Sequence, residues 1–279
     1  MIRDIMVHLD GSPEDEVRLE HGQAIAAMGR AHLTGIYTNL MPDPSVAMPI
    51  DGGGVLMQVL TEMEERARTE GDSTARRLSE RLASLQVPSE LRRLDETFAG
   101  LNAKVTDQAR CSDIFVATRP YTNVDSDTPV WTDLVEAVLF GSGRALLLVP
   151  PGRHRQGPVQ TVLVAWNGSR EAARALRESM SFIEQATRTV ILVVDPEADT
   201  KPWEDVVGHL AHHGVTAEVA TAKTKGVRVT DVILREAHQV SADLIVMGGY
   251  GHTRVREFVF GGATADMLST SERPILVAH

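Results

Sequence analysis

The stretch DIMVHLDGS, residues 4–12, returns as TVLVAWNGS at residues 161–169, and this repeat decides the fold. A second pair follows in the same order, because RALLLV at 144–149 matches RPILVA at 273–278. Self-similarity of this kind is the signature of a duplicated structural unit. The chain is therefore predicted to contain two domains of one fold, each of roughly 130 to 150 residues.

The predicted domains are residues 1–150 and 159–279, joined by a linker at 151–158. The segment PPGRHRQGP at 150–158 combines prolines, glycines and three basic residues and has no apolar period. Such a composition marks a boundary between domains.

Within each copy, short unbroken apolar runs alternate with stretches of helical length. Strands that are apolar throughout are typical of a parallel sheet covered by helices on both faces, and the alternation predicts an α/β fold with doubly wound sheets. In the second copy, strands are predicted at 159–166, 188–194, 216–222, 243–247 and 274–278, and helices at 170–185, 203–213, 229–240 and 263–269. In the first copy, strands are predicted at 2–9, 33–38, 91–94, 113–117 and 144–149, helices at 13–30, 55–85, 101–110 and 132–140, and a loop at 41–54.

The composition is that of a globular protein. Of the 279 residues, 43% are hydrophobic and 24% are charged, and the net charge is −10. Residues 1–150 contain 23 acidic and 14 basic residues, a net −9, and the rest contain 15 acidic and 14 basic residues, a net −1. A negative chain argues against nucleic acid or an anionic membrane as partner. No apolar run approaches the roughly 20 residues that span a bilayer.

The cysteine usage and the amino terminus favour a cytoplasmic protein. Cys111 is the only cysteine, so no internal disulfide is expected. The opening MIRDIMVHLDGS lacks the order of charged, apolar and small residues of a signal peptide. We expect Cys111 to be a small buried residue. His209, His212 and His213 have no nearby carboxylate or cysteine to complete a ligand set, so no metal site is predicted.

Five glycines crowd the stretch MGGYGHTRVREFVFGGAT, residues 247–264. Gly248 and Gly251 follow a predicted strand and frame a tight turn with no Cβ to obstruct a ligand. Gly261 and Gly262 immediately precede a predicted helix, whose N-terminal N–H groups suit a phosphate.

Polar side chains lie close to these glycines along the chain. His252, Arg254 and Arg256 add protonatable or cationic groups, and Thr264 adds a hydroxyl in the first turn of the helix. The spacing is neither that of a P-loop nor that of a Rossmann glycine motif. Spacing alone leaves two interpretations open, a phosphate-binding turn and a turn that lets the helix pack closely on the sheet.

The pattern Gly248-x2-Gly251-x9-Gly261, after DLIVM and before a helix followed by ERPILV, resembles the universal stress protein family. HLDGS and AWNGS resemble the family's opening strand, which usually ends in aspartate followed by Gly-Ser. The resemblance covers both copies and is to the tandem form with two fused domains. It implies, in each domain, an open five-stranded parallel sheet in the order 3-2-1-4-5, a Rossmann-like fold of the adenine-nucleotide α-hydrolase type. It also implies that some members bind ATP, whereas others lack the glycines and do not.

Carried over to this chain, the resemblance assigns roles to the ends of the predicted strands. Ala165 and Asn167 would face adenine, and Val194 would offer main-chain hydrogen bonds to it. Gly262 stands where ATP binders usually have Ser or Thr, and Asn167 stands where Asp is usual, so each departure would weaken binding. The ribose and phosphates would be surrounded by Gly248, Gly251, Gly261, Gly262, Ala263 and Thr264.

The first copy lacks the glycine turn. Thr118-Arg119-Pro120-Tyr121 replaces residues 248–251, and Trp131 and Thr132 stand near the positions of Gly261 and Gly262. Asp10 is retained, but it stands alone, because the glycines that would accompany it at a nucleotide site are replaced. The first domain is therefore predicted to be a partner domain without nucleotide. Family members pair through their last strands, which implies that Leu146–Val149 contacts Ile275–Ala278.

The sequence supports two functional hypotheses, which belong to different classes of protein. In the first, the protein is a cytoplasmic stress-response module whose second domain binds ATP or AMP, with or without Mg²⁺, and whose occupancy signals to a partner. In the second, it is an interaction or scaffold protein that binds no nucleotide. No nucleophile motif of a hydrolase occurs, so no catalytic residue is predicted and ATP hydrolysis is slow at most. The identity of the protein partner and further pairing into a homodimer are left open.

Overall fold

A computed structural model describes residues 1–43, 53–119, 131–155, 157–249 and 263–279. We call residues 1–150 the first domain and 159–279 the second. The first domain contains β1 (Asp4–Leu9), α1 (Glu14–Gly29), β2 (His32–Leu40), α2 (Gly53–Ala83), β3 (Ser89–Glu96), α3 (Phe98–Ala109), β4 (Ile114–Thr118), α4 (Thr132–Gly141) and β5 (Ala145–Val149). The second contains β6 (Thr161–Ala165), α5 (Arg170–Ile183), β7 (Arg188–Val194), α6 (Glu204–His212), β8 (Ala217–Ala222), α7 (Val229–Gln239), β9 (Leu244–Gly248), α9 (Ala263–Thr270) and β10 (Ile275–Ala278).

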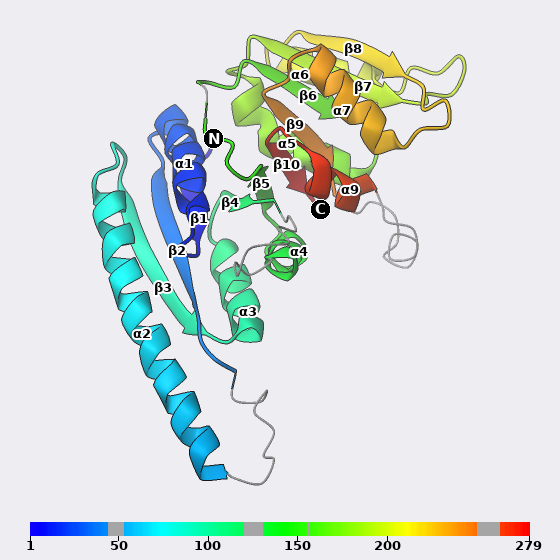
Figure 1. The fold of residues 1–279 in the computed structure, drawn as a ribbon. Helices are drawn as coiled ribbons and strands as arrows, with labels where there is room; N and C mark the ends of the chain where they lie inside the picture. Colours follow the sequence, from blue (N-terminus) through cyan, green and yellow to red (C-terminus); the bar gives the residue numbers. More distant parts are fainter. Residues whose placement is uncertain (44–52, 120–130, 156, 250–262) are drawn as a thin grey trace.

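The strands of the described residues form one sheet in the order β3-β2-β1-β4-β5-β10-β9-β6-β7-β8, which Figure 1 shows running through both domains. Within each domain every neighbouring pair is parallel. Each domain thus has the predicted order 3-2-1-4-5, and the prediction of doubly wound parallel sheets is confirmed. The direction of winding changes between β1 and β4 in the first domain and between β6 and β9 in the second.

The two domains are joined through their last strands. β5 and β10 pair antiparallel, with Leu147 opposite Leu276 at the centre of the contact. Their side chains are buried, at 3% and 0% exposure. The predicted seam between Leu146–Val149 and Ile275–Ala278 is confirmed, and a hydrophobic strand pair makes one continuous sheet of the two halves.

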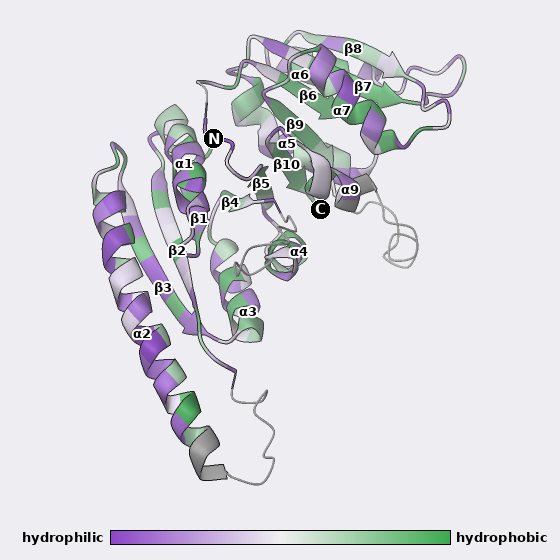
Figure 2. Ribbon diagram, viewed as in Figure 1, coloured by the Kyte–Doolittle hydropathy of each residue, from purple (hydrophilic) through white to green (hydrophobic). Residues whose placement is uncertain are grey.

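Helices cover both faces of this sheet. One buried cluster combines side chains of α1, α2, α5 and α6 with one face of the strands, and a second combines α3, α4, α7 and α9 with the other face. The strands are predominantly apolar and the outer helix faces polar, as Figure 2 shows for β9, β10, α6 and α7. Burial on both faces explains why the central strands read as unbroken apolar runs.

The largest differences from the predicted elements lie at one edge of the sheet. Strand β3 covers Ser89–Glu96, twice the predicted length. The apolar pattern indicated only its centre, because the exposed face carries charges such as Glu90 and Arg92, which form an ion pair of 2.6 Å. Helix α2 begins at Gly53 and extends beyond the sheet in Figure 1. Most of the predicted loop at 41–54 lies outside the described residues. No helix in the described part of the chain combines the length and apolarity needed to cross a bilayer.

The expectation that Cys111 is buried is wrong. Cys111 is exposed in the turn that follows α3, where its backbone N–H donates to the carbonyl of Gln108. The apolar run that suggested burial begins at Ile114, where β4 enters the sheet.

Candidate functional site

The carboxyl ends of β6, β7 and β9 meet at the switch point of the second domain. Ligands of open α/β sheets bind at this edge, beside the point where the winding reverses. Ala165, the last residue of β6, is in register with Met247 of β9 on one side and with Leu192 of β7 on the other. Ala165 and Val194 are half-buried, so both lie at the surface of this edge. The structure thus brings together three strand ends that the sequence singled out.

The turn after β6 starts helix α5. The side-chain Oδ1 of Asn167 accepts a hydrogen bond of 3.1 Å from the backbone N–H of Ser169. Ser169 Oγ in turn accepts from the N–H of Ala172 at 3.1 Å and caps the helix. Gly168 has a φ of 71°, which favours glycine. Asn167 is exposed, and its amide nitrogen donates no hydrogen bond to a described residue. It therefore stays available at the predicted base-binding edge.

Gly248 is required by packing. A Cβ on this residue would lie 2.5 Å from the backbone N of Ala172 and 2.7 Å from the backbone C of Glu171. The first turn of α5 therefore rests directly on the end of β9. Gly249 is similarly close to Val277 and to Leu139 of α4, in the first domain. Gly248 and Gly249 therefore allow close approach of protein to protein, whereas Gly261 and Gly262, which suggested helix packing as an alternative to phosphate binding, lie outside the described residues.

Helix α9 begins at Ala263 and faces the same edge, with Thr264 buried in its first turn. Asp266, also near its start, accepts a hydrogen bond of 2.9 Å from Arg228, which pairs at the same time with Asp231. Arg228, the residue before α7, thus offsets part of the charge of Asp266. The other predicted phosphate contacts, namely Gly251, His252, Gly261 and Gly262, lie outside the described residues.

The far end of α9 is held by the first domain. Nη1 of Arg119 donates to the backbone carbonyl of Ser269 at 2.5 Å and to that of Leu268 at 3.4 Å. A cation at the last carbonyls of a helix satisfies free acceptors and complements the helix dipole. Sequence comparison treated Arg119 only as a replacement of a glycine, whereas the structure gives it a contact between the domains.

At the switch point of the first domain, three charged side chains form a buried cluster. Nη2 of Arg18 lies 2.5 Å from Asp10 Oδ1 and 2.6 Å from Asp15 Oδ1, and each of the three side chains is at most 5% exposed. Asp15 also accepts hydrogen bonds of 2.9 Å from the backbone N–H groups of Asp10 and Gly11. Asp10 thus has close partners in the structure, and nothing in the local sequence indicates that Arg18 of α1 points inward.

His8 and Trp131 close this cluster. His8 Nδ1 lies 3.4 Å from Nη1 of Arg18, which can only donate, so Nε2 carries the proton and donates to Thr38 Oγ1 at 2.9 Å. Trp131 Nε1 donates to Asp10 Oδ2 at 2.7 Å. The Trp131 ring stacks on Phe98 at 5.7 Å and meets the His8 ring edge-on at 4.8 Å. We call His8, Asp10, Asp15, Arg18 and Trp131 the buried polar cluster.

Burial dominates the protonation of the cluster. It lowers the pKa of His8 to about 3, with a further contribution from the positive charge of Arg18. Burial also raises the pKa of Asp15 to about 6, although Arg18 opposes the shift. For Asp10, burial is outweighed by Arg18, His8 and Ser12, which hold the pKa of this carboxyl well below its usual range. The cluster at neutral pH therefore contains a neutral histidine and an arginine shared by two carboxylates.

The second domain has small residues where the first has this cluster. The repeat aligns His8 with Ala165, Asp15 with Ala172 and Arg18 with Ala175. Asp10 aligns with Asn167, and Trp131 directly precedes α4 as Gly262 directly precedes α9. Three positions that carry polar side chains of the cluster in the first domain, namely 8, 15 and 18, therefore correspond to alanine in the second.

Comparison with known proteins agrees with this architecture. Residues 158–279 match the model of the "Universal stress protein family". No curated protein matches the chain. The crystal structure of a universal stress protein from Archaeoglobus fulgidus DSM 4304 is similar with a TM-score of 0.72 and 14% identity, covering 98% of this chain and 97% of that one. A functionally unknown protein from Pseudomonas aeruginosa PAO1 gives 0.61 and 15%, covering 99% and 92%. A universal stress protein in complex with cAMP gives 0.35 and 20%, covering 44% and 99%.

Proposed function

We propose that the protein binds an adenine nucleotide in its second domain, because residues 158–279 match the model of the universal stress protein family and the fold of the whole chain is similar to that of a solved universal stress protein. The ligand, ATP or AMP, would occupy the carboxyl ends of β6, β7 and β9. Occupancy would make the protein a signalling or protective module of the stress response. The single cysteine fits the cytoplasmic location that we propose with it.

The observation that carries this proposal is that alanines at 165, 172 and 175 replace three residues of the buried polar cluster at the second switch point. Ala165 and Val194 would border the base, and Asn167 would offer its amide group. The start of α9 at Ala263 would face the phosphates, where the free N–H groups of a helix N-terminus stabilise negative charge. The pairing of Asp266 with Arg228 supports this role, because it offsets the one carboxylate of the first turn.

The remaining contacts of the proposal come from the glycine stretch. Gly251, His252, Gly261 and Gly262 would surround the ribose and phosphates together with Gly248 and Thr264. Magnesium, where present, would enter on the phosphates of ATP, since the described residues contain no group of three metal-binding side chains. We expect hydrolysis to be slow or absent, and the first domain to bind no nucleotide because its switch point holds the buried polar cluster.

A second candidate function is that of an interaction protein without nucleotide. The packing of Gly248 against the backbone of α5 favours it, because this contact requires the glycine whether or not a ligand binds. The two candidates differ in one measurable property, nucleotide affinity at the second domain.

Titration calorimetry with AMP, ATP and ATP with Mg²⁺ tests the proposal. We expect saturable binding at one site per chain, and loss of it in a Gly251→Val/Gly261→Val variant. Gly208→Val is the matched control, because a Cβ on this residue of α6 meets nothing within 4 Å. Absence of binding to the unaltered protein, together with no ligand-induced rise in its melting temperature, would favour the interaction protein. Binding that survives the double substitution would move the site elsewhere.

A further inference from the structure

A pocket of about 130 Å³ lies between the two domains, on the edge of the sheet opposite to the proposed nucleotide site. It opens at the amino ends of β9 and β10 and beneath the linker. Its floor is apolar, because the buried side chains of Leu147, Phe182 and Leu244 line it. These residues belong to both domains, so the pocket exists only when the two are joined.

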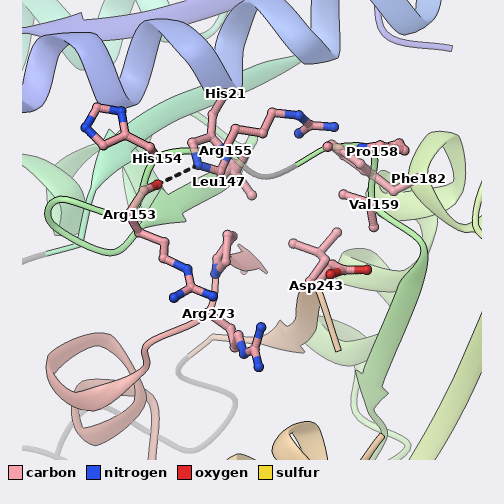
Figure 3. Close-up of a pocket in the computed structure, with 13 residues that line it drawn as sticks. His21, Leu147, Arg153, His154, Arg155, Pro158, Val159, Phe182, Asp243 and Arg273 are labelled. Atoms are coloured by element: carbon pink, nitrogen blue, oxygen red, sulfur yellow. Dashed lines mark hydrogen bonds between the residues drawn. The ribbon is translucent and has the colours of Figure 1, made fainter. Parts of the chain in front are cut away.

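Three arginines line the pocket above this floor. Arg153 and Arg155 come from the linker, and Arg273 comes from the turn before β10. In Figure 3 the side chains of Arg153 and Arg273 extend toward the same side of the pocket, whereas Arg155 runs along the wall near Pro158. Within the described part of the chain, none of the three guanidinium groups forms a hydrogen bond or an ion pair.

The one acid that lines the pocket is already engaged. Oδ2 of Asp243 accepts hydrogen bonds of 2.8 Å from the backbone N–H of Gln160 and 2.9 Å from that of Thr161. Arg155 is half-buried, and burial lowers its pKa even though Asp243 attracts the charge. The arginines thus present more positive charge than the pocket neutralises.

The linker is held in place by α1 through its backbone and one histidine. Gly152 N–H donates to the carboxylate of Glu14 at 2.9 Å, and Arg155 N–H donates to Glu20 at 3.2 Å. His154 points away from the pocket in Figure 3 and pairs with Glu20 at 3.0 Å. The buried His21 contacts the carbonyl of Arg153 through Nε2 at 3.2 Å. The linker segment Gly152–Arg155 is therefore held by α1 without a ligand, which lowers the entropic cost of binding.

Arg273 can be compared with the equivalent arginine of the first domain. Its counterpart in the first domain, Arg144, donates through Nε and Nη2 to the carbonyl of Arg110, at 3.0 and 2.7 Å. Arg144 thus ties the end of α3 to the sheet, whereas Arg273 at the equivalent place makes no such bond and lines the pocket. One copy of the arginine has a structural partner and the other has none among the described residues.

We propose that this interdomain pocket binds a multiply charged oxyanion of the phosphate class, with Arg153 and Arg273 as the principal contacts. The planar donor fork of a guanidinium group matches two oxygens of a phosphate. A cavity of about 150 Å³ holds a benzene molecule, so this pocket has room for one tetrahedral group. A second phosphoryl group, as in pyrophosphate, would lie at the mouth. The bound anion would tie the linker to the start of β10, and thereby one domain to the other.

Calorimetric titration of the full chain with inorganic pyrophosphate, inorganic phosphate and sulfate at constant ionic strength tests the proposal. We expect pyrophosphate to bind at one site per chain. An Arg153→Gln/Arg273→Gln variant should bind it at least about tenfold more weakly, because each substitution removes a charge-assisted contact. Arg68→Gln/Arg177→Gln is the matched control, since it removes two positive charges from exposed residues outside the pocket.

The outcomes separate this site from the nucleotide site. A Gly251→Val/Gly261→Val variant should retain pyrophosphate binding, and loss of binding there would assign pyrophosphate to the second domain's switch point and overturn the proposal. Equal weakening in both arginine pairs would show only a general charge effect and would also overturn it, as would no binding to the unaltered chain at millimolar concentrations. The melting temperature of each variant without ligand shows that it is folded.

Discussion

At the switch point between β1 and β4, the first domain buries the side chains of an arginine, two aspartates and a histidine, whereas between β6 and β9 the second domain has alanines at three of the four equivalent positions. The two switch points are otherwise built alike. In both, an Asx side chain accepts from the backbone N–H two residues later, Asp10 from Ser12 and Asn167 from Ser169, each at 3.1 Å. The local turn is therefore shared, and the difference lies in what fills the space around it.

The two domains thus keep one fold while the surroundings of the switch point differ. Gly248 lets the first turn of α5 rest on β9, whereas its counterpart in the first domain is Thr118, which carries a side chain. The space beneath α1 is filled by Arg18 and its partners. A ligand at the first switch point would have to displace ion pairs that are already out of water, whereas the second has alanine at the positions of His8, Asp15 and Arg18.

The largest effect is expected from breaking the buried polar cluster. Arg18→Ala should lower the free energy of unfolding by about 3–5 kcal/mol, because it leaves two carboxylates buried without their cation. Urea unfolding followed by circular dichroism measures the change. An effect below about 1 kcal/mol, the range of exposed ion pairs, would show that the cluster is open to water.

A double substitution tests whether the second domain's arrangement is tolerated in the first. Asp15→Ala/Arg18→Ala installs the alanines found at 172 and 175. Since it removes one charge of each sign, it should cost less than the sum of the two single substitutions, by about 0.5–3 kcal/mol for residues in contact. Additive costs would contradict a direct coupling between Asp15 and Arg18.

The next largest effect is a pair of opposite pH dependences. The pKa of His8 falls from 6.5 to about 3 on folding, so its contribution to stability is lost as the pH falls from 6.5 toward 3. The pKa of Asp15 rises from 3.8 to about 6, so its contribution is present below 3.8 and is lost as the pH rises through 6. Between pH 4 and 6 the two contributions nearly cancel in the unaltered protein.

Single substitutions remove this cancellation. In His8→Gln, where Asp15 remains, stability should increase as the pH falls from 6 to 4, by up to about 1.4 kcal/mol per pH unit. In Asp15→Asn, where His8 remains, it should decrease by a similar amount. The free energy of unfolding in urea at several pH values gives both slopes, relative to the unaltered protein. Slopes of the same sign would refute the assignment of the two groups.

Much of this fold was predictable because the strands are buried on both faces. The run at 188–194 was predicted with both of its ends correct, and the helix that starts at Arg170 was predicted within two residues of its end. Strand β3 was predicted at half its length, since an edge strand with the pattern SELRRLDE has few apolar residues. Periodicity identifies an element by what it buries, so it fails where an element buries little.

The site was less predictable, for a physical reason. Arg18 lies in EDEVRLE, which has the composition of an exposed helix surface, and nothing local indicates that its guanidinium group is 1% exposed. The signal that was present lies in the repeat. In the alignment of the two copies, three polar residues of the first, His8, Asp15 and Arg18, correspond to alanine in the second. Such a coordinated change indicates that the three residues contact one another. Interdomain contacts such as Arg119 with α9 depend on the joined sheet and have no sequence signal of their own.

A smaller effect concerns the glycine that allows close packing. Gly248→Ala should cost about 1–3 kcal/mol, because the new Cβ would lie 2.5 Å from the backbone of Ala172 and the helix must shift. The control is Gly208→Ala in α6, where a Cβ meets nothing within 4 Å and alanine favours the helix by about 0.5–1 kcal/mol. Urea unfolding should therefore show opposite signs for the same substitution. If Gly248→Ala were neutral, the contact between α5 and β9 would be looser than described.

The smallest effect is expected at Thr118, the counterpart of Gly248 in the first domain. Thr118 is 8% exposed, and its Oγ1 has no hydrogen-bond partner in the described part of the chain. Thr118→Val should raise the free energy of unfolding by about 1 kcal/mol, because it replaces a buried, unpaired hydroxyl by a methyl group of the same shape. Thr38→Val is the control, since Thr38 Oγ1 lies 2.9 Å from His8 and 3.2 Å from the carbonyl of Leu9, and its loss should destabilise the protein. A destabilised Thr118→Val variant would mean that the hydroxyl has a partner, and the first switch point would then hold a second polar contact in addition to the cluster.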